Sequence, residues 1–162
     1  MMIQTHADAE QFVRHPGYSL LELVLVLGIM VILAAIAAPR YAGAASRYRA
    51  EGAARRIVAD LELARTRART YGSSQTVSFS VGANGYQMPG LPSLKDSSTP
   101  YCVTLSDPPY QATLLEVDFG GDETVNFDGW GVPDSGGWVT LRVGDIGRKV
   151  SLDRDTGKAS SQ

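Results

Sequence analysis

Side chains suited to acid–base or nucleophilic chemistry are unevenly spread along the 162 residues. The only two histidines, His6 and His15, lie near the N-terminus, so the C-terminal half holds no Ser-His-Asp or Cys-His arrangement. Cys102 is the single cysteine, which excludes an intrachain disulfide and is typical of a small buried apolar residue. The sequence contains no H-E-x-x-H, C-x-x-C or P-loop motif. These observations predict a protein that is not an enzyme and carries no cofactor.

One cluster of carboxylates could do a different kind of chemistry, the binding of a cation. Calcium prefers carboxylate and carbonyl oxygens, but residues 118–123 do not have the spacing of an EF-hand loop. A solvated acidic rim beside turns is therefore the main interpretation and a calcium site the lesser one, with no metal ligand assigned. The cluster comprises Glu116, Asp118, Asp122, Glu123 and Asp128.

A further carboxylate, Glu22, stands at the start of a long apolar segment. Residues 23–38 carry no charge, and with residues 18–22 they would form a helix of roughly 30 Å, enough to span the core of a bilayer. A charged side chain inside such a segment is costly and calls for an explanation. A secretory signal peptide fits residues 35–37 loosely as a cleavage site, and a plain signal anchor fits the length, but neither explains Glu22.

The residues around Glu22 supply a third interpretation. Residues 17–22, GYSLLE, resemble the type IV prepilin motif, in which a glycine and an aromatic residue precede a short apolar stretch and a glutamate. The resemblance implies that residues 1–17 are a leader, that a prepilin peptidase cuts between Gly17 and Tyr18, and that Tyr18 becomes N-methylated. It also implies that Glu22 stays in the membrane as an assembly contact, paired with the free amine of a neighbouring subunit.

Residues 39–72 are predicted to continue the same helix as an amphipathic half. Pro39 removes a backbone donor and is expected to kink the helix. Gly72 follows the last apolar position and predicts the helix end. An apolar stripe recurs at steps of four and three residues, through Ala50, Ala54, Ile57, Leu61, Ala64, Ala68 and Tyr71, and is expected to pack on the rest of the chain.

This amphipathic half is strongly basic. Residues 40–72 hold eight arginines against three acidic residues, a net charge of +5, whereas residues 73–162 hold six basic and eleven acidic residues, a net charge of −5. We interpret the arginines off the stripe as a solvated face that contacts lipid or other subunits. Nucleic-acid binding is the alternative, because clustered arginines neutralise phosphates, but no stacking platform or DNA-binding motif supports it. These arginines are Arg47, Arg55, Arg56, Arg65, Arg67 and Arg69.

The sequence changes to a period of two at residue 75, where Val77, Phe79 and Val81 are expected to face inward. A turn follows at residues 83–85, a short returning strand at 86–88 and an exposed loop at 88–100. Further strands are predicted at residues 101–105, 112–119, 124–127, 138–143 and 149–152. The predicted fold is therefore α+β, with residues 18–38 and 39–72 as the transmembrane and amphipathic halves of one helix, packed on a small antiparallel β-sheet or sandwich body at residues 73–162.

A second resemblance covers the helix-to-strand junction at residues 56–81 and C-terminal segments at 125–129, 138–141, 150–153 and 156–158. These are similar to the H-type minor pseudopilins of type II secretion and to the FimT-type minor pilins, the GspH/FimT family. The family's L-x-x-A-R-x-x-A pattern is matched by Leu61, Ala64, Arg65 and Ala68.

The resemblance implies a minor pseudopilin or pilin of a type II secretion or type IV pilus-like filament. Such a subunit would cross the inner membrane once, keep its β body in the periplasm and join other pseudopilins or pilins at the filament tip to support protein secretion. Its further partners would be the prepilin peptidase, the inner-membrane assembly platform and membrane lipid. Two alternatives stay open at this point, a DNA-binding minor pilin of an uptake pilus and a secreted β protein with an ordinary signal peptide.

Overall fold

The structure is a computed structural model that describes residues 19–93 and 98–162. The chain divides into two compact units, residues 1–40 and 41–162. One helix, α1 (Leu20–Tyr71), contributes to both units. The predicted long N-terminal helix is therefore confirmed. Its backbone is helical through residue 39, and the kink proposed at Pro39 stays a prediction.

Within the second unit, α1 buries the predicted apolar stripe against the β body. Six of the seven stripe residues are at most 2% exposed, and Ala53 on the flank is also fully buried. Most of these residues are alanines, whose small side chains let strands lie close to the helix axis. The seventh, Tyr71, is the last residue of α1 and is 66% exposed, so its predicted burial is wrong.

Gly72 ends α1 as predicted. Its φ of +59° is in the left-handed region that favours glycine, and the N–H of Ser73 donates to the carbonyl of Ala68 at 3.2 Å. This bond satisfies one of the carbonyls that a helix end would otherwise leave without a partner. The chain then turns directly into the first strand.

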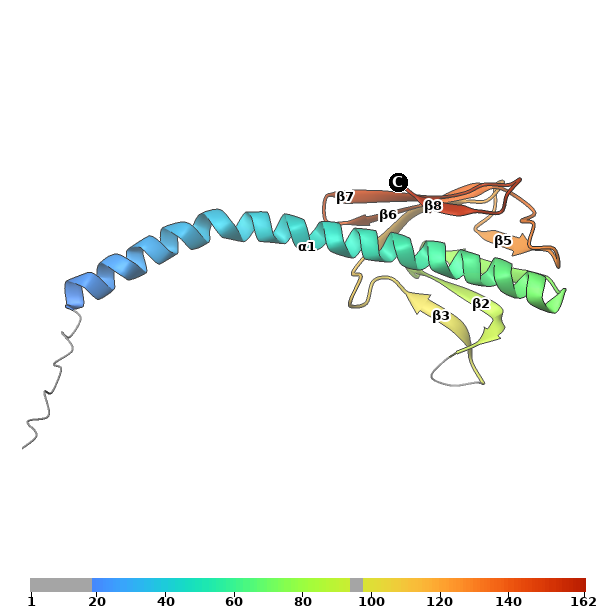
Figure 1. The fold of residues 1–162 in the computed structure, drawn as a ribbon, viewed down its shortest axis with the longest axis horizontal. Helices are drawn as coiled ribbons and strands as arrows, with labels where there is room; N and C mark the ends of the chain where they lie inside the picture. The colour runs from blue at the N-terminus through green and yellow to red at the C-terminus, as the bar shows by residue number, and fades with distance from the viewer. Residues whose placement is uncertain (1–18, 94–97) are drawn as a thin grey trace, which may run out of the picture. The chain divides into compact units, whose positions relative to one another are not determined.

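Among the described residues after Gly72, eight strands form two four-stranded sheets (Figure 1). Every pairing within the sheets is antiparallel, as predicted. The first sheet has the order β3-β2-β1-β5, and its strands are β1 (Gln75–Ser80), β2 (Gly85–Pro92), β3 (Pro100–Thr104) and β5 (Thr124–Phe127). The second has the order β4-β6-β7-β8, with β4 (Thr113–Asp118), β6 (Gly137–Val143), β7 (Ile146–Leu152) and β8 (Ala159–Ser161).

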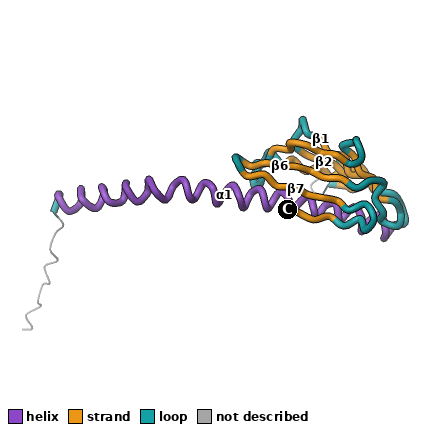
Figure 2. Tube along the Cα trace, turned by 90° about the horizontal axis from the view of Figure 1, so that it is seen from above, coloured by secondary structure: helices purple, strands orange, loops and turns teal. Residues whose placement is uncertain are grey.

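Both sheets turn apolar side chains towards the C-terminal part of α1, alongside which Figure 2 shows the strands gathered. In β1 the alternation is as predicted for Val77 and Phe79, which are buried, whereas Val81 is half-buried in the turn after the strand. The ring of Phe79 lies 5.5 Å from that of Phe119, which follows β4, so the two sheets share one core. The predicted α+β fold is confirmed.

Two strand predictions need correction. The expected loop at residues 88–100 is shorter, because β2 continues to Pro92 after a break in its register with β3. Pro89 and Pro92 are tolerated there because the β1–β2 pairing covers only residues 85–87 of β2. The strand β8 was not predicted, since three small residues carry no alternating apolar pattern; it pairs with β7 through Leu152 and Ala159.

Candidate functional site

The first half of α1 is the candidate membrane anchor. Residues Leu20–Ala37 have a mean hydropathy of 2.9, and none of them is buried in the structure. This is the one helix within residues 19–93 and 98–162 that is long and apolar enough to cross a membrane. A segment of large aliphatic side chains with no protein contact fits a single-pass anchor.

Glu22 lies in the first turn of α1 with an exposed side chain. The first backbone N–H groups of a helix have no intrahelical partner, and they favour a carboxylate nearby. Ser19 caps this end: its Oγ accepts from the N–H of Leu21 at 3.3 Å, and its carbonyl accepts from the N–H of Leu23 at 3.1 Å. The Ser-x-x-Glu spacing is that of a capping box, a signal that sequence reasoning missed. Capping of the helix start therefore accounts locally for Ser19 and Glu22 at these two positions.

The predicted cleavage residues, Gly17 and Tyr18, lie outside the described residues. The proposed cut, the methylation of Tyr18 and the pairing of its amine with Glu22 therefore stay predictions. Within the described chain, the carboxylate of Glu22 has no hydrogen bond or ion pair, so any partner for it comes from elsewhere.

The arginines of the second half of α1 have contacts inside the body. Arg55 bonds Glu51 at 3.0 Å, and Glu51 also bonds Arg148 of β7 at 3.2 Å. The hydrogen bond from Arg148 has the largest effect on the pKa of the Glu51 carboxyl, followed by that from Arg55, and both hold this pKa below its usual value. The ion pair between Glu51 and Arg148 connects α1 to β7 near the start of the packed region.

Further along α1, three more of these arginines reach the C-terminal loops or a neighbouring ring. Arg65 bonds Glu62 at 3.3 Å and donates to the carbonyl of Thr156 at 2.6 Å. Arg69 donates from Nε to the carbonyl of Trp130 at 2.8 Å, and the guanidinium of Arg67 lies 5.0 Å from the ring centroid of Tyr71.

Arg56, the fifth of these arginines with a contact inside the chain, belongs to a buried polar cluster that the sequence did not reveal, formed by Arg56, Asp60, Tyr86 and Tyr101 (the Asp60 cluster). Asp60 is 5% exposed, and its Oδ2 accepts from the hydroxyls of Tyr86 at 2.6 Å and Tyr101 at 2.9 Å. Arg56 donates from Nε to the same oxygen at 3.0 Å and from Nη2 to the hydroxyl of Tyr101. The cluster connects α1 to β2 and β3.

Burial dominates the electrostatics of the Asp60 cluster. It raises the pKa of Tyr86 well above the ordinary tyrosine value, and the negative charge of Asp60 raises it further. Both effects keep the hydroxyl protonated, so that it can donate to the carboxylate. The only sequence signal for this cluster was the spacing of Arg56 and Asp60, four residues apart on one helix face.

Of the six predicted surface arginines, Arg47 is exposed and the other five make the contacts described above. These intramolecular roles favour the structural interpretation over nucleic-acid binding. Each of the five guanidinium groups contacts a carboxylate, a carbonyl or an aromatic ring of the protein itself. They therefore do not form a continuous row that could bind the phosphates of a nucleic acid.

Four of the five acidic residues in and after β4 are solvated, in agreement with the predicted acidic rim. Glu116, Asp122, Glu123 and Asp128 are exposed and Asp118 is half-buried. Across the described residues, no three His, Cys, Asp or Glu side chains come together in a way that could hold a metal ion. Asp118 instead accepts from the N–H of Gly121 at 2.7 Å, which stabilises a turn.

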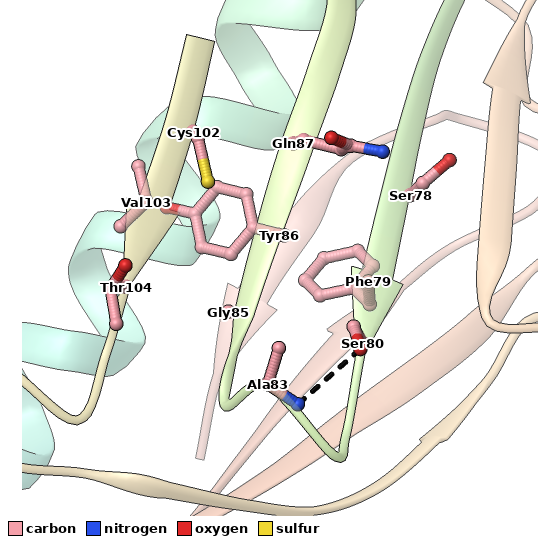
Figure 3. A pocket seen from close by; sticks show the side chains of 10 residues that line it. All are labelled: Ser78, Phe79, Ser80, Ala83, Gly85, Tyr86, Gln87, Cys102, Val103 and Thr104. Atoms are coloured by element: carbon pink, nitrogen blue, oxygen red, sulfur yellow. Dashed lines mark hydrogen bonds between the residues drawn. The ribbon is translucent and has the colours of Figure 1, made fainter. Parts of the chain in front are cut away.

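A small pocket of about 210 Å³ lies on the first sheet over β1, β2 and β3 (Figure 3). Ser78, Gln87 and Cys102 stand opposite one another on the three strands, and the pocket contains no acidic or basic side chain. Cys102 is exposed, so its predicted burial is wrong. Its neighbours Tyr101 and Val103 point to the other face, which α1 and the core cover. The pocket offers hydrogen-bonding groups but no catalytic pair.

Comparison with known proteins gives one match. The family model of type II transport protein GspH matches residues 53–156, from the packed half of α1 through β7. No curated protein and no solved structure matches the chain.

Proposed function

The chain belongs to the type II transport protein GspH family, and we propose that it is a minor pseudopilin matured by cleavage after Gly17 and assembled at a filament tip. The family is a structural component of type II secretion and not an enzyme. Association with other pseudopilins follows from the family in general. Processing, tip location and the identity of the neighbouring subunits belong to the proposal.

The observation that carries the proposal is the division of α1 into two halves with opposite surroundings. The family match covers the packed half and the sheets, and an unburied apolar segment precedes it on the same helix. A subunit built this way keeps its body outside the bilayer while its helix remains free to contact lipid and neighbouring helices. We propose the periplasm as the location of the body.

Glu22 is the proposed assembly contact. A carboxylate in an apolar surrounding is stabilised by a positive partner, and the free amine of a processed neighbour supplies one. The first turn of α1 leaves the Glu22 side chain exposed, which supports its availability for such a contact. In a filament subunit, this pairing would link membrane insertion to docking on the subunit below.

The mature N-terminus is the decisive measurement. The full-length chain is expressed in cells that contain a prepilin peptidase, and the membrane-associated product is examined by mass spectrometry. We expect a chain that starts at Tyr18 and carries one methyl group on its amine. A start near Ala38 would replace the proposal with an ordinary signal peptide, and an uncut chain would replace it with a plain signal anchor.

A further inference from the structure

A hollow of about 430 Å³ lies beside the C-terminal end of α1, lined by Arg69, Gly72, Gly129 and Trp130 (the Trp130 hollow). Trp130 is 81% exposed, and nearby Val132 is 46% exposed. An indole is among the largest apolar groups a protein can bury, and water around it is unfavourable. The fold therefore displays a large apolar side chain at a concave place on the body.

The loop that carries Trp130 is held in one conformation by its own hydrogen bonds. The Oδ1 atom of Asp128 accepts from the N–H of Trp130 at 2.9 Å and from that of Val132 at 2.8 Å. The backbone of Asp128 accepts from Gly131 at 2.8 Å and donates to Val132 at 2.9 Å. Residue 133 pairs with residue 127 and closes the loop.

Two glycines let this loop lie directly on the end of α1. Gly131 has a φ of +75°, and a Cβ atom there would lie 2.7 Å from the Cγ of Arg69. A Cβ atom on Gly129 would lie 2.8 Å from the carbonyl oxygen of Gly72. Both distances are shorter than real Cβ contacts, so larger residues would push the loop off the helix. The exposure of Trp130 is thus fixed by the packing and is not the result of a loose loop.

Arg69 gives the hollow hydrogen-bond donors and a positive charge. Its Nε donates to the backbone carbonyl of Trp130, and both residues line the hollow. Among residues 19–93 and 98–162, neither terminal nitrogen of Arg69 has a hydrogen-bond or ion-pair partner. A guanidinium presents these donors in a plane that matches a carboxylate. Tryptophan and arginine are also the residue types that contribute most to binding at protein interfaces.

We propose that the Trp130 hollow docks a carboxylate-bearing segment on the body of another filament subunit. The inference rests on the proposed function, because it takes its partner from the filament. The indole would contact an apolar side chain of that segment, and the terminal nitrogens of Arg69 would bind its carboxylate. A nucleic acid fits less well, because Arg69 is the one basic side chain that lines the hollow, and a run of phosphates needs several such groups to neutralise it. A loop already fixed in its binding conformation loses little entropy on docking.

Site-specific photocrosslinking tests the proposal on the full-length chain in cells that make the filament. A photoreactive phenylalanine analogue replaces Trp130 in one variant, and adducts are identified by mass spectrometry. We expect an adduct with another prepilin-type subunit, attached within a segment that contains Asp or Glu. Adding Arg69→Glu should lower the adduct yield at least about tenfold, whereas Arg69→Lys should retain part of it.

Two further probe positions make the result specific. Leu115, an exposed apolar residue of β4, carries the same analogue as a surface control and should give little of this adduct. Leu27, in the apolar half of α1, reports contact with neighbouring helices and so tests the proposed function. Adducts from Leu27 without any from position 130 would overturn the docking site and leave the proposed function standing. The same adduct from Leu115, or an adduct of position 130 with nucleic acid or lipid, would also overturn the docking site. No subunit adduct from either position 27 or 130 would contradict the proposed function itself.

Discussion

The two halves of α1 use the same backbone for opposite purposes. Leu20–Ala37 is composed mainly of large aliphatic residues, and none of them is buried. The packed half has small side chains in place of large ones and is buried in place of exposed. Its contact positions are mostly alanines, which the strands cover. Total hydropathy therefore does not reveal which half belongs to the core of the folded protein. The size of the side chains at the repeating positions is the better guide, since small residues allow close packing and large ones fill a surrounding of lipid or other helices.

The carboxylates of the two halves show the same contrast. Asp60 receives three hydrogen bonds within its own chain, and Glu22 receives none from the described residues. A buried carboxylate with a full set of donors is part of the stability of the body. A carboxylate in an apolar helix with no donor depends on its surroundings. The comparison predicts that the body is stable by itself and that the anchor acquires its role only in an assembly.

Separating the two halves should have the largest effect. A chain of residues 44–162 should lose membrane association completely and yet unfold cooperatively, because nearly all of the second unit is retained. Thermal unfolding followed by circular dichroism, with fractionation of cells that express either length, measures both properties. A truncated chain that is unfolded or aggregated would show that the packed half of α1 needs the anchor to fold.

A bulky charged residue at the cleavage position tests the anchor half alone. In Gly17→Glu, the peptidase would meet a side chain where it expects none, so the precursor should persist at about 17 residues above the mature length and should not assemble. Immunoblotting against the wild type gives the size. Gly28→Ala is the control, because a Cβ atom there meets nothing within 4 Å and cleavage should continue. Normal-sized product from Gly17→Glu would reject prepilin processing.

Removal of the Asp60 carboxylate should destabilise the body strongly. Asp60→Ala leaves the buried hydroxyl of Tyr86 without its acceptor, and Arg56 loses its partner, so we expect the free energy of unfolding to fall by about 3 kcal/mol. Denaturant unfolding is the measurement. Asp145→Ala, at an exposed turn between β6 and β7, should stay within about 0.5 kcal/mol of the wild type. Equal effects of the two substitutions would mean that the Asp60 cluster contributes no net stability.

Glu22→Ala should affect association and leave the body intact. We expect cleavage after Gly17 and membrane insertion to be nearly unchanged, with reduced co-purification of partner subunits because the neighbouring amine loses its counter-charge. Pull-down at equal expression measures this, and Glu22→Gln shows how much depends on charge alone. Unchanged association of the alanine variant would make Glu22 a capping residue of the first turn and nothing more.

The smallest effect concerns alkaline pH. Because the pKa of Tyr86 is raised by folding, this residue adds stability that is fully present below the unfolded tyrosine pKa of about 10 and is lost as the pH rises above it. The free energy of unfolding should therefore fall by up to about 1.4 kcal/mol per pH unit above pH 10 because of this group. Tyr86→Phe should flatten that slope, and Tyr48→Phe, at an 81% exposed position, should not. Parallel slopes for all three chains would assign the alkaline loss to other groups.

Local periodicity explains why much of the fold could be predicted from the sequence. The steps of three and four residues along α1, the left-handed Gly72 and the alternation in β1 are all determined by neighbours within a few positions. The predicted burial of Cys102 is wrong because the face of β3 that is covered depends on where α1 lies, which no local pattern reports. The same holds for Tyr71, which continues the spacing of the stripe but is exposed at the last position of α1.

The candidate sites also differ in whether local sequence or long-range packing determines them. Glu22 could be found from its spacing within an apolar segment. The Asp60 cluster and the Trp130 hollow each join α1 to loops or strands at least 26 residues further along the chain, as the bond between Asp60 and Tyr86 shows. Such contacts are decided by the packing of the sheets on the helix. The spacing of Arg56 and Asp60 indicates an ion pair on one helix face but says nothing of the two tyrosines that complete the cluster.

The exposure of Cys102 has a practical consequence for experiments on this protein. It is the only thiol in the chain and it faces solvent from an edge strand, so a disulfide formed in an oxidising compartment would have to join two different chains. The natural sequence also accepts one maleimide dye or spin label per subunit at a known position, with no engineered residue. Quenching of that label would report directly when another protein covers the outer face of the first sheet.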